Sequence, residues 1–158
     1  MDTKTLADAY QQLLLAAERI TESTPLAALE RSDVDWLLAH IALSDRILAT
    51  AARDVLAGIP VVIDNQAAMD DDNIAQLIGS TTYVQRIDAV RRNGAEFADL
   101  VRQVPERTGS VTVQLRVHDR SGRRISDSRA TWAELVDLRA TKHIPGHAQR
   151  LAELASRA

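Results

Sequence analysis

The chain has 158 residues, 46% of them hydrophobic and 26% charged, and its 19 basic and 22 acidic residues leave a net charge of −3. This length suits a single domain, which we expect to span residues 1–158, and the balanced charge shows no basic footprint for nucleic acid. Cysteine is absent, which excludes disulfides, a thiol nucleophile and thiolate metal ligands.

The sequence also indicates where the protein works. Its first residues lack the charged-then-apolar pattern of a signal peptide, and no apolar run approaches membrane-spanning length. We therefore expect a cytoplasmic protein with neither membrane nor nucleic-acid partners. Aromatic residues are only 3% of the chain, so the core must consist mainly of Leu, Ile, Val and Ala, which favours helix-on-helix packing.

Helical periodicity dominates the first two thirds of the chain. Apolar residues recur at helical spacing over three stretches, which predict helices at residues 4–21, 33–57 and about 73–104. Ser32 is the expected N-cap of the second helix, and the third has a possible break near residues 79–82. Residues 59–72 are expected to be irregular, and Val61–Ile63 is too short an apolar run to assign.

A strand period follows. Apolar and polar residues alternate over 111–117, a turn follows at 119–122, and residues 123–128 can return as a second strand. These segments predict a β-hairpin, with His118 exposed to solvent at its tip. A capping box of Thr131 and Glu134 then starts a last helix that runs to about residue 156. The expected fold is all-α: a four-helix bundle with a β-hairpin inserted between helices 3 and 4.

Two histidines in the last helix are the strongest chemical signal. His143 and His147 are four residues apart, about one helical turn, so both imidazoles can face one metal ion. Pro145 and Gly146 lie between them and oppose a regular helix. Helix propensity alone predicts that the helix ends near Lys142 and that another begins at Pro145. The alternative is one helix with a kink.

A metal site needs a third ligand. His40 is the natural candidate, because it lies in mid-helix and bundles form their sites between facing helices. The alternative is that His40 is a buried histidine satisfied by one hydrogen bond. His40, His143 and His147 are thus the predicted metal ligands, and no catalytic residue is assigned.

Other polar residues near these histidines have ordinary interpretations. Arg46, Arg139 and Lys142 are interpreted as solvated helix charges, although they could attract an anionic substrate. Asp64 and Asn65 are assigned to an ordinary turn, with a place at the mouth of the site as the alternative.

Together these features resemble the DinB-like superfamily of small helical bundles. The resemblance rests on the segment Asp35–His40, on Thr131–Leu135 and on the His143–His147 segment, and it covers nearly the whole chain. The family includes the N-terminal domains of mycothiol-dependent maleylpyruvate isomerases and related thiol S-transferases. The resemblance implies that His40, His143 and His147 hold a divalent transition metal, with zinc or nickel foremost.

Three functions follow from this resemblance and the residues. The first is a metal-binding protein that acts as a thiol-dependent S-transferase or isomerase on a small molecule, with a low-molecular-weight thiol such as mycothiol as second cofactor. The second is a non-catalytic bundle that binds a partner or forms a homodimer, with structural histidines. The third is a metal-dependent hydrolase with the same ligands.

Overall fold

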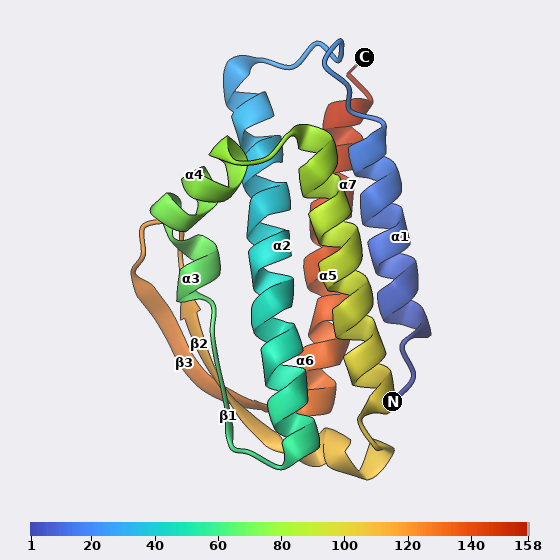
Figure 1. Cartoon of the computed structure of the whole chain (residues 1–158), viewed down its shortest axis with the longest axis vertical. Coiled ribbons are helices and arrows are strands. Elements are labelled where there is room, and N and C mark those ends of the chain that lie inside the picture. The colour runs from blue at the N-terminus through green and yellow to red at the C-terminus, as the bar shows by residue number, and fades with distance from the viewer. Residues whose placement is uncertain (158) are drawn as a thin grey trace.

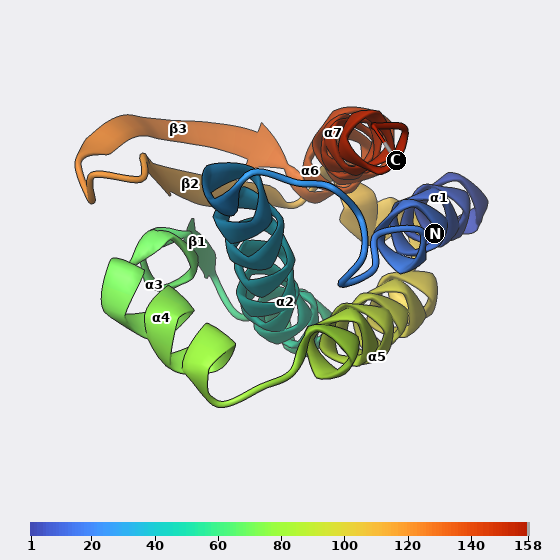
Figure 2. The same ribbon diagram turned by 90° about the horizontal axis from the view of Figure 1, so that it is seen from above.

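The computed structural model describes residues 1–157 and shows a mostly helical chain with a small sheet on one side (Figure 1). The longest helices run side by side around a common core, as the view from above shows (Figure 2). They are α1 (Lys4–Glu18), α2 (Ala28–Ala57), α5 (Tyr83–Gln103) and a final run of α6 (Trp132–Leu138), a π-helical turn (Arg139–His143) and α7 (Ile144–Ala155). The fully buried side chains between them include Leu13, Leu38, Phe97, Trp132 and Leu151.

The predicted fold class is wrong in what lies outside these helices. The chain carries a three-stranded mixed sheet, not a lone hairpin, and it has further helices beyond a four-helix bundle. The strands are β1 (Val61–Asp64), β2 (Thr112–His118) and β3 (Arg124–Thr131), in the order β1-β2-β3. The added helical segments are α3 (Gln66–Met69), α4 (Asp71–Gly79) and a 3₁₀ turn (Glu106–Ser110).

Strand β1 explains the error. It pairs in parallel with β2, so that Val61 lies opposite Val113 and Ile63 opposite Leu115. A parallel partner about fifty residues away leaves no turn signal in the sequence, and a four-residue apolar run has no readable period. The antiparallel pairing of β2 and β3 is confirmed, with Gly122 at φ +78° in the turn between them.

Helix starts were predicted with mixed success. Thr131 and Glu134 cap α6 reciprocally as expected: the Glu134 backbone N–H donates to the Thr131 hydroxyl at 3.2 Å. The prediction of Ser32 as an N-cap is wrong, because α2 begins at Ala28. There the Glu30 carboxylate accepts a hydrogen bond from the Ala27 N–H at 3.0 Å. The helix starts four residues before Ser32, and the Glu30 carboxylate satisfies the backbone donor of Ala27 there.

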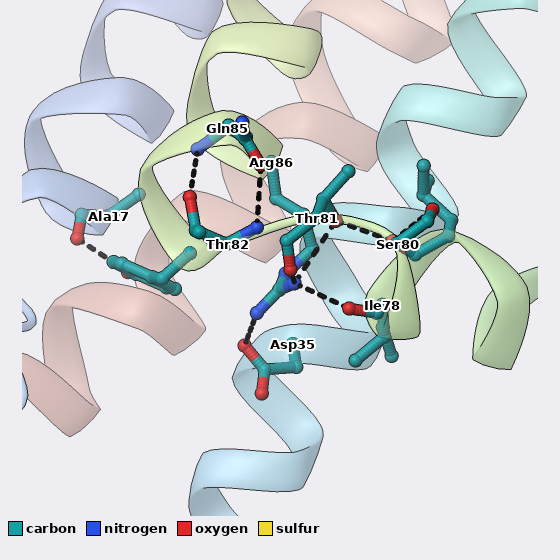
Figure 3. Close-up of polar contacts among 10 residues, drawn as sticks. Ala17, Asp35, Ile78, Ser80, Thr81, Thr82, Gln85 and Arg86 are labelled. Atoms are coloured by element: carbon teal, nitrogen blue, oxygen red, sulfur yellow. Dashed lines mark hydrogen bonds and ion pairs between the residues drawn. The ribbon is translucent and has the colours of Figure 1, made fainter.

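The expected break near residues 79–82 separates α4 from α5, and Arg86 holds it in place (Figure 3). The buried Arg86 guanidinium donates to the carbonyl of Thr81 at 2.7 Å and to Asp35 on α2 at 2.6 Å. The connection between the helices is therefore tied to α2 by a buried ion pair. Within residues 1–157, none of the helices combines the length and the apolarity needed to cross a bilayer.

Candidate metal centre

His40 lies in the middle of α2 and is held from two sides. Its Nδ1 is 2.8 Å from the carbonyl oxygen of Ala68 in α3, and its ring stacks on Trp36 with centroids 4.9 Å apart. A carbonyl only accepts, so Nδ1 carries the proton and Nε2 keeps a free lone pair. This is the arrangement in which an imidazole is oriented for metal binding by a partner of its second nitrogen. The helix α3, which the sequence did not predict, supplies that partner.

His143 and His147 reach the same place by way of the π-helical turn. The Ile144 N–H donates to the Arg139 carbonyl, five residues back, and Pro145 follows with no N–H to donate. The helix therefore neither ends at Lys142 nor continues as a regular α-helix: one wider turn passes the chain into α7. Single π turns within α-helices are frequent at functional sites. The rings of His143 and His147 have their centroids 4.6 Å apart.

The three histidines converge. Their ligand nitrogens all lie within 4.8 Å of one another, and the His40 centroid is 5.6 Å from that of His143 and 5.7 Å from that of His147. Nitrogens bound to one ion at about 2.1 Å lie roughly 3–3.5 Å apart, so the most distant pair of ligand nitrogens must close by up to roughly 1.5 Å. Three imidazoles form a donor set that fits zinc, nickel, iron or copper and leaves a coordination position open.

The electrostatic environment keeps these rings neutral. Burial, together with nearby Arg139, lowers the pKa of His143 to about 2. Burial, together with His40 and Arg139, lowers the pKa of His147 to about 4. Burial also lowers the pKa of His40. Only a deprotonated imidazole binds a metal, so near neutral pH all three rings already have the neutral charge state that metal binding requires.

Arg139 is buried beside His143, and its predicted exposure to solvent is wrong. It was interpreted as a solvated charge, but it is only 5% exposed, and its guanidinium pairs with the fully buried carboxylate of Asp45. The Tyr10 hydroxyl donates to the same carboxylate. A second guanidinium nitrogen, Nη1, lies 2.8 Å from Nδ1 of His143. Arginine has only donors, so Nδ1 of His143 must accept this hydrogen bond.

A cavity of about 630 Å³ opens beside the three histidines. Its wall combines residues of α2, the sheet and the last helical run, including Trp36, Leu115, Leu135 and all three histidines. In Figure 2 the sheet lies beside α2, on the side where α3 and α4 are also found. This volume is in the usual range for small-molecule sites. The three histidines therefore share a wall with a space large enough for a ligand.

His118 also lines this cavity, and its predicted exposure to solvent is wrong. It is 6% exposed, and its backbone is held by Asn65, whose side-chain oxygen accepts from the His118 N–H at 2.6 Å. Asn65 therefore holds the end of β2 and lines the cavity. This position matches the alternative given for Asn65, a place at the mouth of the site. Alternation along β2 places His118 on the face opposite Val113, Leu115 and Val117, but the strand register shifts between Val117 and His118, and His118 is buried. His118 is not among the converging ligands.

Comparisons with protein-family models, with curated proteins and with solved structures each found no match. The resemblance to the DinB-like superfamily therefore stays a prediction that rests on the residues quoted for it.

Proposed function

We propose that this protein binds one divalent transition metal ion through His40, His143 and His147, and that it uses the ion on a small molecule held in the adjoining cavity. The observation that supports this is the convergence of the three ligand nitrogens within 4.8 Å at the wall of a 630 Å³ cavity. A purely structural site would need no such space beside its ligands, so the cavity favours catalysis over the non-catalytic alternative.

The reaction class follows from the donor set and from the family resemblance. When bound, the metal lowers the pKa of a thiol or a water at its open position, which makes a nucleophile at neutral pH. We propose a thiol-dependent transfer or isomerisation, supported by the resemblance to mycothiol-dependent enzymes. The residues of this chain supply the rest: Ala68 fixes the tautomer of His40, and the apolar part of the cavity wall packs against the substrate.

The metal site is tested by measuring metal content in protein purified without a polyhistidine tag. We expect one equivalent of zinc or nickel to bind the wild type. The variants His40→Ala, His143→Ala and His147→Ala should each lower affinity by more than about 100-fold, beyond the 10–100-fold typical of outer-sphere changes. His118→Ala is the matched control, because it removes a buried histidine of the same cavity that is not in the triad. Unchanged metal content in all three triad variants would contradict the proposal.

The reaction class needs a separate assay. Metal-loaded protein is incubated with a low-molecular-weight thiol and electrophilic substrates, and in parallel with simple esters and amides. Thiol-dependent turnover that is lost in His147→Ala supports the proposal. Hydrolysis without thiol would instead assign the protein to metal-dependent hydrolases.

A further inference from the structure

Unsatisfied hydrogen-bond donors collect around the cavity beside the triad. Among residues 1–157, the buried polar atoms without a hydrogen-bond partner in the protein include Trp36 Nε1, Arg116 Nε and His118 Nδ1, and all three residues are among those that line this cavity. The indole and guanidinium nitrogens can only donate. His118 Nδ1 lies 3.2 Å from the Asp64 carboxylate, without the angle of a hydrogen bond. A ligand that fits these groups must carry a strong acceptor.

The charged residues of the cavity wall indicate the charge of that ligand. Its charged lining residues are Arg116, Arg120, Arg139 and Asp119. Arg139 is neutralised by Asp45, and Asp119 accepts hydrogen bonds from the N–H groups of Ser121 and Arg123 within its own turn. On the sheet side, Arg116 is left without a counter-charge in the described part of the chain, and Arg120 has only a half-exposed ion pair with Asp33.

The two remaining arginines differ in their surroundings. Within residues 1–157 no ion pair or hydrogen bond is found for the Arg116 side chain, whereas Arg120 has a half-exposed pair with Asp33 at 3.2 Å. The Arg120 guanidinium carbon lies 3.7 Å above the Trp36 ring, and Trp36 stacks on His40. A cation held against an aromatic ring is weakly hydrated and is well suited to bind an anion. Contacts therefore run from the hairpin turn, through Trp36, to the candidate metal ligand.

The rest of the cavity is apolar. Ile63, Leu115 and Leu135 contribute to its wall, and Leu138 and Ile125 line it although they are 51% and 57% exposed. Large apolar side chains left open to water beside a cavity are typical of a ligand site. A ligand that fits must therefore have an apolar body next to its anionic group.

We infer that the cavity binds a small amphiphilic acid, with its carboxylate on the guanidinium groups of Arg116 and Arg120 and its apolar body against the leucine and isoleucine side chains. This inference names a substrate class for the proposed function and rests on that function for the metal beside the ligand. The carboxylate pairs with the unsatisfied donors, and the apolar body covers the exposed rim.

The test compares three probes that share one alkyl chain: octanoate, octanol and octylamine. Binding is measured by isothermal titration calorimetry on the full chain after the metal has been removed with a chelator, so that a carboxylate cannot bind through the metal. We expect octanoate to bind best and octylamine worst. Because a hydrogen bond to a charged group is lost, Arg116→Gln and Arg120→Gln should each weaken octanoate binding by about 10-fold or more, and leave octanol unchanged. Arg107→Gln, an exposed arginine of the 3₁₀ turn, is the matched control.

Each outcome separates the inference from the proposed function. Equal binding of the three probes, or octanoate binding that is insensitive to both arginine variants, overturns the inference even if the metal binds. Octanoate binding that appears only with metal and ignores the arginines overturns it as well. If the wild-type protein prefers octanoate in an arginine-dependent way but binds no metal when zinc or nickel is added, the anion site is supported and the proposed function is contradicted. Arg116→Lys keeps the charge and should lose less affinity than Arg116→Gln if the variant is folded.

Discussion

His143 takes part in two interactions that compete. In the structure its Nδ1 accepts a hydrogen bond from Arg139 at 2.8 Å. Coordination through Nδ1 would displace the guanidinium, and coordination through Nε2 would move the ring proton to Nδ1, which can no longer accept from Arg139. In either case the hydrogen bond must break before the metal binds. We therefore expect Arg139 to lower the affinity of the candidate site for a metal ion.

This competition can be measured by removing Arg139. Arg139→Met alone would leave the Asp45 carboxylate buried without its partner, at a cost of about 3–5 kcal/mol, so the variant to use is Asp45→Leu with Arg139→Met. We expect its zinc affinity to rise by about 10-fold over wild type, the equivalent of one hydrogen bond to a charged group. Calorimetric titration provides the measurement, and Asp45→Asn, which keeps Arg139, is the control. An unchanged or lower zinc affinity would contradict the competition.

The neutral histidines also predict how stability depends on pH. The pKa of His147 is about 4 in the folded protein, below its ordinary value of 6.5, so between these values the unfolded chain binds a proton that the folded chain does not. The free energy of unfolding must therefore fall as the pH decreases. From pH 7.5 to 5.5 we expect His147 to contribute a loss of about 1 kcal/mol. Urea unfolding at several pH values measures the free energy of unfolding of metal-free wild type and of His147→Gln. The free energy should fall more steeply with decreasing pH in the wild type, and equal slopes against pH would contradict the prediction.

At the scale of elements, the last helical run contains two residues that disfavour helix, and they differ in what they do to its shape. Pro145 cannot donate a backbone hydrogen bond, and the π turn before it accommodates that loss while keeping His143 and His147 on neighbouring turns. Gly146 is different, because nothing lies within 4 Å of the position that a Cβ would take there. No close contact at this position requires glycine.

Two glycine substitutions separate packing from propensity. Gly146→Ala should raise the free energy of unfolding by about 0.5–1 kcal/mol, since alanine is the better helix former. Gly94→Ala in α5 should lower it by about 1–3 kcal/mol, because the new Cβ would lie 2.6 Å from Cε1 of the buried Tyr10 ring. Tyr10 cannot move aside without losing its hydrogen bond to Asp45. Denaturant unfolding of both variants measures the effects, and a stabilising Gly94→Ala would contradict this packing.

At the scale of the whole molecule, the candidate site joins segments that are far apart in the sequence. His40 comes from α2, His143 and His147 come from the last helical run, and the cavity is completed by the sheet (Figure 1). An ion bound to all three histidines links these segments only in the folded state. Metal binding must therefore stabilise the fold.

This linkage predicts a metal-dependent melting temperature. At a free zinc concentration 100 times the dissociation constant, the folded state should gain about 2.7 kcal/mol, which shifts Tm by about 5–10 °C for a chain of this size. Thermal unfolding followed by circular dichroism measures the shift. Magnesium is the control, since it prefers oxygen ligands and should leave Tm unchanged. A zinc-induced shift of the same size in His40→Ala would show that the stabilisation arises elsewhere.

The sequence by itself determined the features that depend on near neighbours. The helical stripes of α1, α2 and α5, the alternation of β2 and the capping box at Thr131 all follow from contacts within a few residues. The histidine spacing belongs to the same class, because four residues make about one helical turn whether or not that turn is regular.

Only the tertiary structure decided which side chains meet. The parallel pairing of β1, the burial of His118 and Arg139, and the convergence of His40 with the last helical run depend on segments that are distant in the chain. Burial and long-range pairing are properties of the packed molecule. The periodicity of a short sequence segment carries no information about its contacts with distant segments. For this reason the sequence predicts Arg139 as a solvated charge and Asn65 as a turn residue, whereas in the fold both lie beside the candidate site together with His118.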